Sequence, residues 1–541
     1  MTNPPTETDT GSGPPSPKRA PWLSSVHGPV FWPAALLILG FVVWGAFGAD
    51  QNEEGELTGS LGSAIGTVRD GIVSNLGWYY ILVVTGFVVV ALIFGMSRMG
   101  NIKLGKEDDK PEFSTKAWFA MLFSAGMGIG LVFFGVAEPM YHLAGPKPGV
   151  EGTPQELGDA AMTQTILHWG VHAWAIYVVI ALAIAYSVYR KGRSISLRWV
   201  LEPIFGDRVK GWLGDLIDVL AILGTVFGVA TSLGLGARQI AAGLDELNIV
   251  SDAGDTLLVT IIVVITLIAI TSVVTGLNKG IKWLSNVNVS VAGLLALFVL
   301  IAGPTIFILR EFVQSIGGYL QTILALSFDV TSFQSEAGEA WMGGWTIFYW
   351  GWWVSWAPFV GMFIARISKG RTIREFVIGV LGVPVLVSIA WFAIMGGTGL
   401  YDNIIGDGEI DAGGASDRML FEMLNTLPAS TLVTGVAVIL IVTFFVTSSD
   451  SGSLVVDMLA SGGDPNPPTW SRVFWASMEG AVAIVLLLAG GLVALQAGSI
   501  ALGVPFSIVI LLSVFASWKA FSNDPMAVSK PPKEKEPVST G

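Results

Sequence analysis

Tryptophan is concentrated in one apolar stretch of the 541-residue chain. Four tryptophans fall within seven residues there, and a proline follows two positions after the last of them: Trp350, Trp352, Trp353, Trp356 and Pro358. If the stretch is a helix, Trp350, Trp353 and Trp356 recur every three residues and share a face. Indole ring faces attract cations by about 0.5–2 kcal/mol each. The chemistry that this group predicts is the binding of a positively charged ligand.

A second aromatic group lies in another apolar stretch and consists of Trp169, Trp174 and Tyr177. Trp174 and Tyr177 are three residues apart and would lie on one side of a helix. A quaternary ammonium has no N–H group to donate, so ring faces hold it where a hydrogen-bonded salt bridge cannot form. The two groups together predict an aromatic box for such a head group.

Glycines interrupt a third apolar stretch at every second position, at Gly126, Gly128 and Gly130. Each glycine costs about 1 kcal/mol relative to alanine in a helix interior. Close packing between helices would explain the spacing of Gly126 and Gly130, but it leaves Gly128 unexplained. The alternative, which we favour, is an unwound helix whose N–H groups face a ligand carboxylate.

Adjacent hydroxyl groups lie in a fourth apolar stretch, where Thr447 and Ser448 precede Asp450. Such hydroxyls often bond to their own helix backbone, and residue type alone favours that explanation. Together with carbonyl groups freed by the glycine interruption, they could instead bind sodium. Asp450 is then expected to orient them.

Acidic residues are scarce within the apolar stretches, and those near or inside a span include Glu138, Asp215, Asp218 and Asp450. A cation without a carboxylate of its own would need a buried acid as its partner. A zwitterion brings its own carboxylate, so we expect a zwitterionic compound. Glycine betaine is the leading candidate, and dimethylsulfoniopropionate, proline and ectoine stay open.

The composition makes lipid the main solvent of the chain. Charged residues make up 13% and hydrophobic residues 52%, whereas soluble domains have about a quarter charged. The absence of cysteine excludes thiolate chemistry and cysteine metal sites, and four histidines argue against a multi-histidine site. The net charge of −12 comes without a basic stripe, which excludes nucleic acid as a partner. No cofactor is expected.

Twelve apolar stretches reach the roughly 20 residues that a membrane helix needs. They are Phe31–Phe47, Leu76–Phe94, Ala117–Tyr141, His168–Tyr189, Trp212–Ile240, Thr256–Thr275, Val287–Leu309, Trp345–Ile367, Phe376–Met395, Thr431–Leu459, Phe474–Leu495 and Ser499–Trp518. Between the seventh and eighth, Arg310–Phe333 is apolar only in patches and is expected to lie along the membrane surface.

Charge alternates between the loops. Basic residues follow the even-numbered stretches, as in the Arg190–Arg198 loop and the tail from Lys519. Acidic residues follow the first, third and ninth stretches, as in the Asp50–Glu56 loop. Because cytoplasmic loops collect lysine and arginine, both termini are expected inside a cell membrane. The loop after the tenth stretch is the weak case, with Arg472 alone.

These motifs resemble those of the betaine/choline/carnitine transporter family, from about Trp32 to Trp518. The resemblance rests on the glycine stretch followed by Glu138-Pro139, on the Trp169 group, on the run from Trp350 to Phe376, and on Thr447–Ser451. It implies an all-α membrane fold of 12 transmembrane helices, with two inverted, LeuT-like five-helix repeats. The implied parts are a disordered cytoplasmic tail (1–30), two leading helices (31–116), the first repeat (117–309), an amphipathic surface helix and loop that help form a homotrimer (310–340), the second repeat (341–518) and a short cytoplasmic tail (519–541).

The resemblance also implies site residues. The aromatic box would be Trp169, Trp174, Tyr177 and Trp353, with Trp356 toward the inner path and Trp350 and Trp352 lining it more loosely. The principal sodium site would use carbonyl groups of Ser124, Met127 and Phe444 and the hydroxyls of Thr447 and Ser448.

At two positions this chain differs from particular members of the family. A second sodium site in sodium-coupled members uses Thr225, a threonine one turn later and Phe359, but here the middle position is Val229. Members that carry choline tend to have aspartate where this chain has Gly130, which favours a zwitterion here. Osmotically regulated members have a longer basic C-terminal helix than this tail.

The implied function is sodium-coupled uptake of glycine betaine, or a similar compatible solute, by alternating access. The alternative is a sodium-independent exchanger or a choline/carnitine-type carrier, which Arg238 keeps open and Thr447 and Ser448 oppose. A channel would show a charged ring, and an intramembrane enzyme would need a carboxylate–histidine cluster or another catalytic group. Neither is expected, because His168 and His172 lack a third ligand and would line the outer vestibule.

Overall fold

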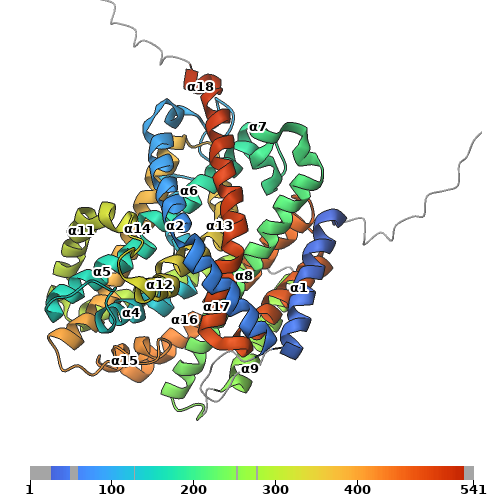
Figure 1. Ribbon diagram of the computed structural model, residues 1–541. Helices are drawn as coiled ribbons and strands as arrows, with labels where there is room; N and C mark the ends of the chain where they lie inside the picture. The colour runs from blue at the N-terminus through green and yellow to red at the C-terminus, as the bar shows by residue number, and fades with distance from the viewer. Residues whose placement is uncertain (1–25, 49–58, 127, 252–253, 276–277, 529–541) are drawn as a thin grey trace, which may run out of the picture.

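The computed structural model of the protein describes residues 26–48, 59–126, 128–251, 254–275 and 278–528. Within these residues all regular structure is helical, apart from one isolated bridge between Lys103 and Thr372. The helices pack into a single bundle (Figure 1), and the predicted all-α class is confirmed. Most of the predicted tail 1–30, and residues 529–541 of the other tail, lie outside the described residues.

Nine helices in the described part of the chain are long and apolar enough to cross a membrane. They are α1 (Gly28–Gly48), α2 (Ser60–Met96), α5 with α6 (together Pro154–Arg190), α8 (Trp212–Glu246), α9 (Asp255–Thr275), α10 (Asn278–Ala302), α14 (Ile373–Ile404), α16 (Ser430–Ala460) and α17 (Thr469–Ser522). The protein is therefore a multi-pass membrane protein.

Two of the predicted spans are missing from that set, and both carry predicted site residues. The span predicted at Ala117–Tyr141 is divided into α3 (Thr115–Gly126) and α4 (Ile129–Ala144), each too short to cross a membrane alone. The other is α13 (Thr346–Ile367), which has the length but contains many tryptophans. The polar N–H of each indole makes tryptophan only partly apolar.

Helix α17 is bent and is far longer than one membrane crossing. Its 54 residues would extend about 80 Å if straight, whereas the bilayer core is about 30 Å thick. The backbone is non-helical at Gly490 and Gly491, and the φ of Gly491 is 55°, a left-handed conformation that glycine adopts readily. The boundary predicted between Leu495 and Ser499 therefore lies more than one turn after the observed bend.

The span predicted at His168–Tyr189 begins too late. Helix α5 (Pro154–Trp169) precedes it, and only Gly170 separates α5 from α6 (Val171–Ala185), which ends in a π turn at Tyr186–Arg190. Polar residues such as Gln164 lower the hydropathy of α5, although they are buried. His168 consequently lies in the interior with 0% exposure, not in an outer vestibule.

The surface helix also begins earlier than predicted. Helix α10 ends at Ala302, and α11 runs from Thr305 to Ser327, so the boundary expected at Leu309 was wrong. Pro304 explains the break, because proline has no N–H to continue the α10 hydrogen bonds. One face of α11 buries Glu311 and Ser315, and the other exposes apolar residues including Val313, Leu320 and Leu324. The helix is therefore amphipathic.

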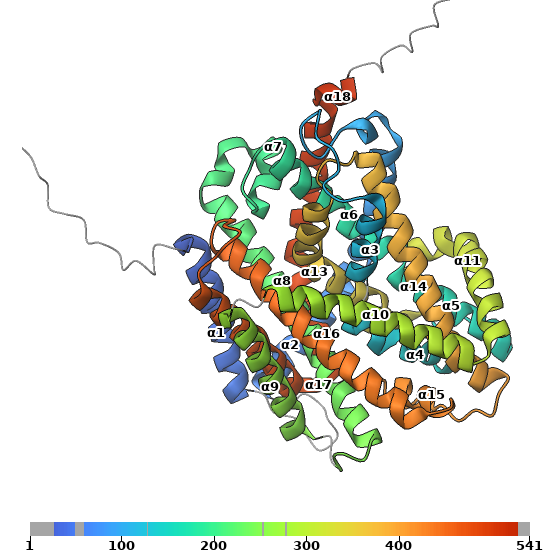
Figure 2. The same ribbon diagram turned by 180° about the vertical axis from the view of Figure 1, so that it is seen from behind.

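Short helices lie at the two ends of the bundle. Helices α7 (Glu202–Phe205) and α18 (Pro525–Val528) lie at one end and α15 (Met419–Asn425) at the other, while α12 (Ser335–Gly344) precedes α13. The 3₁₀ turns at Arg98–Asn101, Leu197–Leu201 and Gly206–Lys210 join the remaining segments. Figure 2 shows α10 and α16 crossing the face opposite to α2.

Backbone hydrogen bonds join two loops that are far apart in sequence. The Leu104 N–H donates to the carbonyl of Arg371 (2.8 Å), and the Gly370 N–H donates to the carbonyl of Leu104 (2.8 Å). Gly370 has a φ of 81°, and a Cβ at this position would lie 2.3 Å from the Lys110 carbonyl oxygen. Glycine is thus required at the crossing, which ties the loop between α2 and α3 to the loop between α13 and α14.

Candidate functional site

A central cavity of about 80 Å³ lies where α4, α5, α6, α8, α13, α14 and α16 meet. Its lining includes nine of the predicted site residues, which are Gly128, Gly130, Trp169, Trp174, Tyr177, Trp352, Trp353, Trp356 and Ser448. Ile129, Leu131, Ala173, Ser232, Val360 and Ser388 complete the lining, which has no charged side chain. The two aromatic groups, distant in sequence, therefore meet around one space.

The rings of the central cavity hold one another in fixed orientations. Trp353 stacks on Trp352 with centroids 4.7 Å apart, and Trp169 meets Trp353 edge-on at 4.8 Å. Trp174 and Tyr177 form a second edge-on pair at 5.5 Å. The Trp356 indole donates to the carbonyl of Gly228 on α8 (2.6 Å). The arrangement offers preorganised ring faces to a cation.

Trp350 does not belong to the central cavity, contrary to the prediction. Its ring stacks on His172 with centroids 5.4 Å apart, and His172 Nε2 lies 2.9 Å from the Ser327 hydroxyl. The reason is helix geometry, since residues three apart differ by about 300°, and Trp350 and Trp356 are therefore about 120° apart. Trp352, predicted to line the path loosely, is a wall of the cavity.

The glycine stretch is the point where a helix breaks. Helix α3 ends at Gly126, and Gly128 is the extended residue before α4 begins at Ile129. The first N–H groups of α4 have no partner within the helix, and Ile129 and Gly130 line the central cavity. Met127, a predicted sodium ligand, lies outside the described residues, and of Ser124 only its place in α3 is described.

Gly130 allows two indoles to close over the backbone. A Cβ there would lie 2.6 Å from Cη2 of Trp352 and 3.1 Å from Cη2 of Trp169. We therefore expect Gly130→Ala to displace these rings and to weaken ligand affinity about tenfold, because overpacking costs about 1–3 kcal/mol. Tryptophan fluorescence titration of the purified variant measures it. Gly128→Ala, at a position with open space around it, is the comparison, and an equal loss in both variants would contradict the role of ring packing.

A buried carboxylate that the sequence left without a role fixes the Trp169 side of the central cavity. Glu138 on α4 is fully buried. Its Oε2 accepts hydrogen bonds from the Trp169 indole (2.6 Å) and the Tyr349 hydroxyl (2.5 Å), and its Oε1 lies 2.6 Å from His168 Nδ1. Trp353 donates to the His168 carbonyl (2.9 Å). We call Glu138, His168, Trp169 and Tyr349 the Glu138 clamp.

The Glu138 clamp contradicts the expectation that the bundle has no carboxylate–histidine cluster. His142 Nε2 also lies 3.4 Å from Glu138 Oε1, and the Glu138, His142 and His168 ligand atoms all lie within 4.8 Å of one another. The contacts of Glu138 with His168, Trp169 and Tyr349 have hydrogen-bond lengths, so the cluster holds helices together. In the sequence, Glu138, His142 and His168 lie in or beside apolar stretches, and this was the signal that could have revealed the cluster.

An inner cavity of about 310 Å³ lies beside the central cavity and shares Gly128, Trp356, Val360 and Ser448 with it. Phe359, Phe444 and Thr447 also line it. The Thr447 hydroxyl donates to its own helix, to the carbonyls of Thr443 (3.0 Å) and Phe444 (3.1 Å), and accepts from Asn288 (3.2 Å). The contact with Asn288 was not predicted. The bonds from Thr447 to its own helix backbone are those that residue type alone favoured.

The residues of the possible second sodium site are not brought together in one cavity. Phe359 lines the inner cavity, whereas Thr225 lines neither this cavity nor the central one. The Thr225 hydroxyl donates to the Ala221 carbonyl (2.8 Å), and Val229 packs beside Gly452 of α16.

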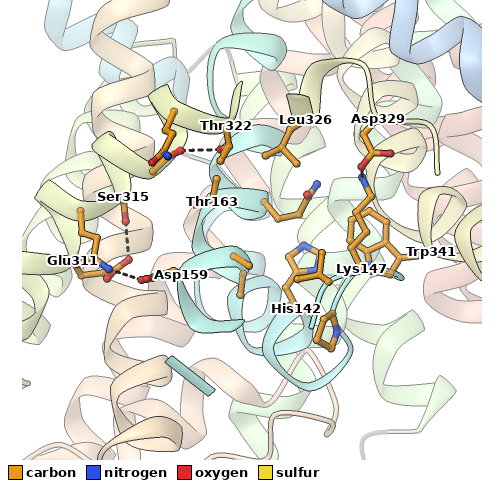
Figure 3. A pocket seen from close by; sticks show the side chains of 18 residues that line it. His142, Lys147, Asp159, Thr163, Glu311, Ser315, Thr322, Leu326, Asp329 and Trp341 are labelled. Atoms are coloured by element: carbon orange, nitrogen blue, oxygen red, sulfur yellow. Dashed lines mark hydrogen bonds and ion pairs between the residues drawn. The ribbon is translucent and has the colours of Figure 1, made fainter. Parts of the chain in front are cut away.

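An outer cavity of about 430 Å³ lies between α4, α5, α11 and α12. Figure 3 shows Lys147, Asp329 and Trp341 on one side and Asp159, Glu311 and Ser315 on the other. Lys147 pairs with Asp329 (2.8 Å). Burial raises the pKa of Asp329, but bonds from Lys147 and the Thr331 N–H outweigh it and hold that pKa below its usual value.

Comparisons with known proteins identify the family of the chain. A model described as betaine/carnitine/choline family transporter matches residues 29–526. The chain is 45% identical to the glycine betaine transporter OpuD of Bacillus subtilis, over 94% of this chain and 97% of the relative. It is 49% identical to an uncharacterized transporter of Mycobacterium tuberculosis, over 93% and 84% of the two chains.

A further relative and one solved structure complete the comparison. Glycine betaine transporter 1 of Vibrio parahaemolyticus is 42% identical, over 91% of this chain and 92% of the relative. The solved structure is a mutant manganese transporter of Eremococcus coleocola, with a TM-score of 0.45 and 14% identity over 75% of this chain and 82% of that one. On its matching family model and relatives, this chain is a membrane transporter, not an enzyme, and belongs to the betaine/carnitine/choline transporter family.

Proposed function

We propose that this transporter takes up glycine betaine, or a quaternary-ammonium zwitterion of similar size, together with sodium. The central cavity carries the proposal, because five indoles and the Tyr177 ring line it without a charged side chain. A trimethylammonium group would lie against the ring faces. The carboxylate of the same ligand would meet the first N–H groups of α4, where the helix dipole favours an anion. The relatives named as glycine betaine transporters support this substrate.

Sodium would bind between the broken α3–α4 segment and α16. Its ligands would be the carbonyls of Ser124, Met127 and Phe444 and the hydroxyls of Thr447 and Ser448. Interrupted helices expose carbonyl groups that coordinate sodium, and Gly128 at the interruption lines the same inner cavity as Thr447 and Ser448. The Thr447 hydroxyl donates its proton to the backbone but keeps lone pairs for a cation. The site at Thr225 and Phe359 has weaker support, because Thr225 lines neither cavity.

Transport would proceed by alternating access. The central and inner cavities are separated by a thin partition that includes Trp356 and Val360, which line both. On the opposite side, the Glu138 clamp closes the central cavity toward the outer cavity, whose lining includes His142. Opening of the partition would release the ligand inward, and opening of the clamp would admit it from outside.

The proposed architecture has twelve membrane crossings, since the bend at Gly490 and Gly491 would divide α17 into two. Residues 31–116 would form two leading helices, and 117–309 and 341–518 would form the inverted repeats, so that broken α3–α4 and tryptophan-rich α13 begin the two halves. The segment 310–340, with the exposed apolar face of α11, would contact other subunits of a homotrimer. The protein would lie in the cell membrane with both termini cytoplasmic.

The exchanger alternative receives no support from Arg238. Its Nε pairs with Asp417 Oδ2 (3.0 Å), and it lines neither the central nor the inner cavity. It is therefore not placed to substitute for a sodium ion. A choline-type carrier would need an acid in the aromatic cavity to balance its cation, and the described lining has none.

Uptake into liposomes tests the proposal. Purified transporter with an inward sodium gradient is expected to accumulate labelled glycine betaine, whereas replacement of sodium by potassium should abolish the accumulation. One sodium ion moving across 100 mV releases about 2.3 kcal/mol, which supports roughly fiftyfold accumulation. Equal uptake in the two salts would contradict sodium coupling. Competition by choline, carnitine, proline and ectoine ranks the ligands.

A further inference from the structure

A carboxyl group without a counterion of its own lies deep in the bundle, beside the helix that carries Thr447 and Ser448. Glu479 on α17 is 0% exposed, and among the described residues no hydrogen bond of ordinary geometry reaches its oxygens, although the Ser449 hydroxyl of α16 lies near the carboxyl group. A Cβ at Gly452 of α16 would lie 3.2 Å from Glu479 Oε1 and 2.9 Å from Cγ2 of Val229 on α8. The carboxyl group is therefore enclosed by three helices.

The charges near Glu479 come from α16 and from α17 itself. Asp450 and Arg472 act on it electrostatically, but these two groups already pair with each other (3.0 Å). Arg472 lies about two turns along α17 from Glu479, toward the end where the helix begins. Asp450 thus pairs with Arg472, rather than with the neighbouring hydroxyls as the sequence suggested. The arginine charge is already balanced, which leaves Glu479 without a counterion.

The other neighbouring helices bring no charge to this point. The described length of α1 has no charged residue, and in α9 the only one is Asp255, at its first position. Along α8 the nearest charged residues to Val229 are Asp218 and Arg238, about three and two and a half turns away. From α9, the neighbour of this part of α17 is Thr266, which lies against Gly480.

An ionised carboxylate at this place would be a buried, unpaired charge, which costs several kcal/mol. A proton removes that charge without further ligands, whereas a metal ion would need several oxygens around it. Val229 and Gly452, which flank the group, have no side-chain oxygen, and neither the central nor the inner cavity includes Glu479 in its lining. Intramembrane carboxyl groups of this kind carry protons in transporters.

We propose that Glu479 binds and releases one proton in each transport cycle, so that a proton is carried inward with the substrate. The proposal rests on the proposed sodium-coupled uptake and extends it with a second coupling ion. The O–H bond forms with a proton from the outer solution and breaks when that proton passes to water on the cytoplasmic side. Val229 leaves no hydroxyl for a second sodium, and both Val229 and Glu479 lie against Gly452. The proton would take the place of that sodium ion.

Accumulation measurements in liposomes test the proposal. Full-length transporter is reconstituted with a fixed inward sodium gradient and a clamped membrane potential, and equilibrium accumulation of labelled glycine betaine is measured with and without a pH difference of one unit, acidic outside. One coupled proton is expected to raise the accumulation ratio about tenfold. Glu479→Gln, which keeps the shape but cannot titrate, is expected to remain sodium-dependent and to lose the tenfold response.

Glu311→Gln is the matched control, because Glu311 is also buried (7% exposed) but lies on α11. It should keep the full response to the pH difference. Wild-type accumulation that needs sodium but ignores pH would overturn the proton and leave the proposed function standing. A tenfold response retained in Glu479→Gln would overturn the assignment to this residue. If that variant does not fold, the wild-type measurement still decides whether a proton is coupled, and Glu479→Asp, which keeps a carboxyl group, should respond as wild type does.

Discussion

Replacement of Trp353 by alanine is expected to lower the affinity for glycine betaine roughly a hundredfold. The Trp353 ring is both a wall of the central cavity and the support of two other walls, since it stacks on Trp352 and meets Trp169 edge-on. Its removal takes away one cation-binding face, about 2 kcal/mol when desolvated, and the aromatic pairs that orient its neighbours, about 0.5–1.5 kcal/mol each. Tryptophan fluorescence titration in detergent measures the affinity.

Trp350→Ala is the control that isolates ligand contact from packing. Trp350 and Trp353 lie on the same helix, both are buried, and only Trp353 lines the central cavity. Each substitution leaves a large void and is expected to cost about 3–5 kcal/mol of stability, which thermal unfolding measures. Affinity should change less than threefold in Trp350→Ala. Similar affinity losses in both variants would show that Trp353 acts through packing alone.

Replacement of Glu138 by alanine is expected to reduce transport more than a hundredfold. Three donors, from His168, Trp169 and Tyr349, would lose their acceptor in a buried place, at about 1–3 kcal/mol each. The Trp169 ring would then lose its fixed position in the cavity wall. Initial uptake rates over a range of betaine concentrations should show a higher KM together with a lower maximal rate.

Two further variants separate the parts of that effect. Trp169→Phe keeps a ring but has no N–H group, so it removes one bond of the Glu138 clamp and should raise KM about tenfold, the worth of one bond to a charged acceptor. Glu311→Ala removes another buried carboxyl that accepts one hydrogen bond, from Ser315 (2.7 Å). It should leave KM unchanged. A Glu138→Ala variant with normal KM would contradict a role of the clamp in shaping the cavity.

Residue type and local spacing were enough to predict most of the aromatic cavity. Indoles deep in an apolar helix must face other side chains or a ligand, so the two tryptophan groups identified walls that meet in the structure. The glycine stretch likewise predicted the break before Ile129, because glycine destabilises a helix interior. The prediction that Trp350 lines the cavity was wrong because residues spaced three apart turn progressively around the helix axis.

Contacts between distant segments could not be predicted in this way. Glu138 and Tyr349 are on different helices and far apart in sequence, and no local pattern reports that they meet. The length of α5 was hidden because its buried polar residues have partners on other helices, as when His168 Nε2 lies 2.9 Å from the Thr346 hydroxyl of α13. Whether the sodium ligands assemble as predicted is left to the uptake experiment.

The backbone ladder between the loops at Leu104 and Gly370 has a mechanical meaning for the cycle. It joins the loop before α3 to the loop after α13. A tilt of one helix would therefore be transmitted to the other through these two backbone hydrogen bonds. Independent rocking of the two would break those links, and the tight crossing at Gly370 leaves no slack between them. We therefore expect the start of α3 and the end of α13 to move together during the transport cycle.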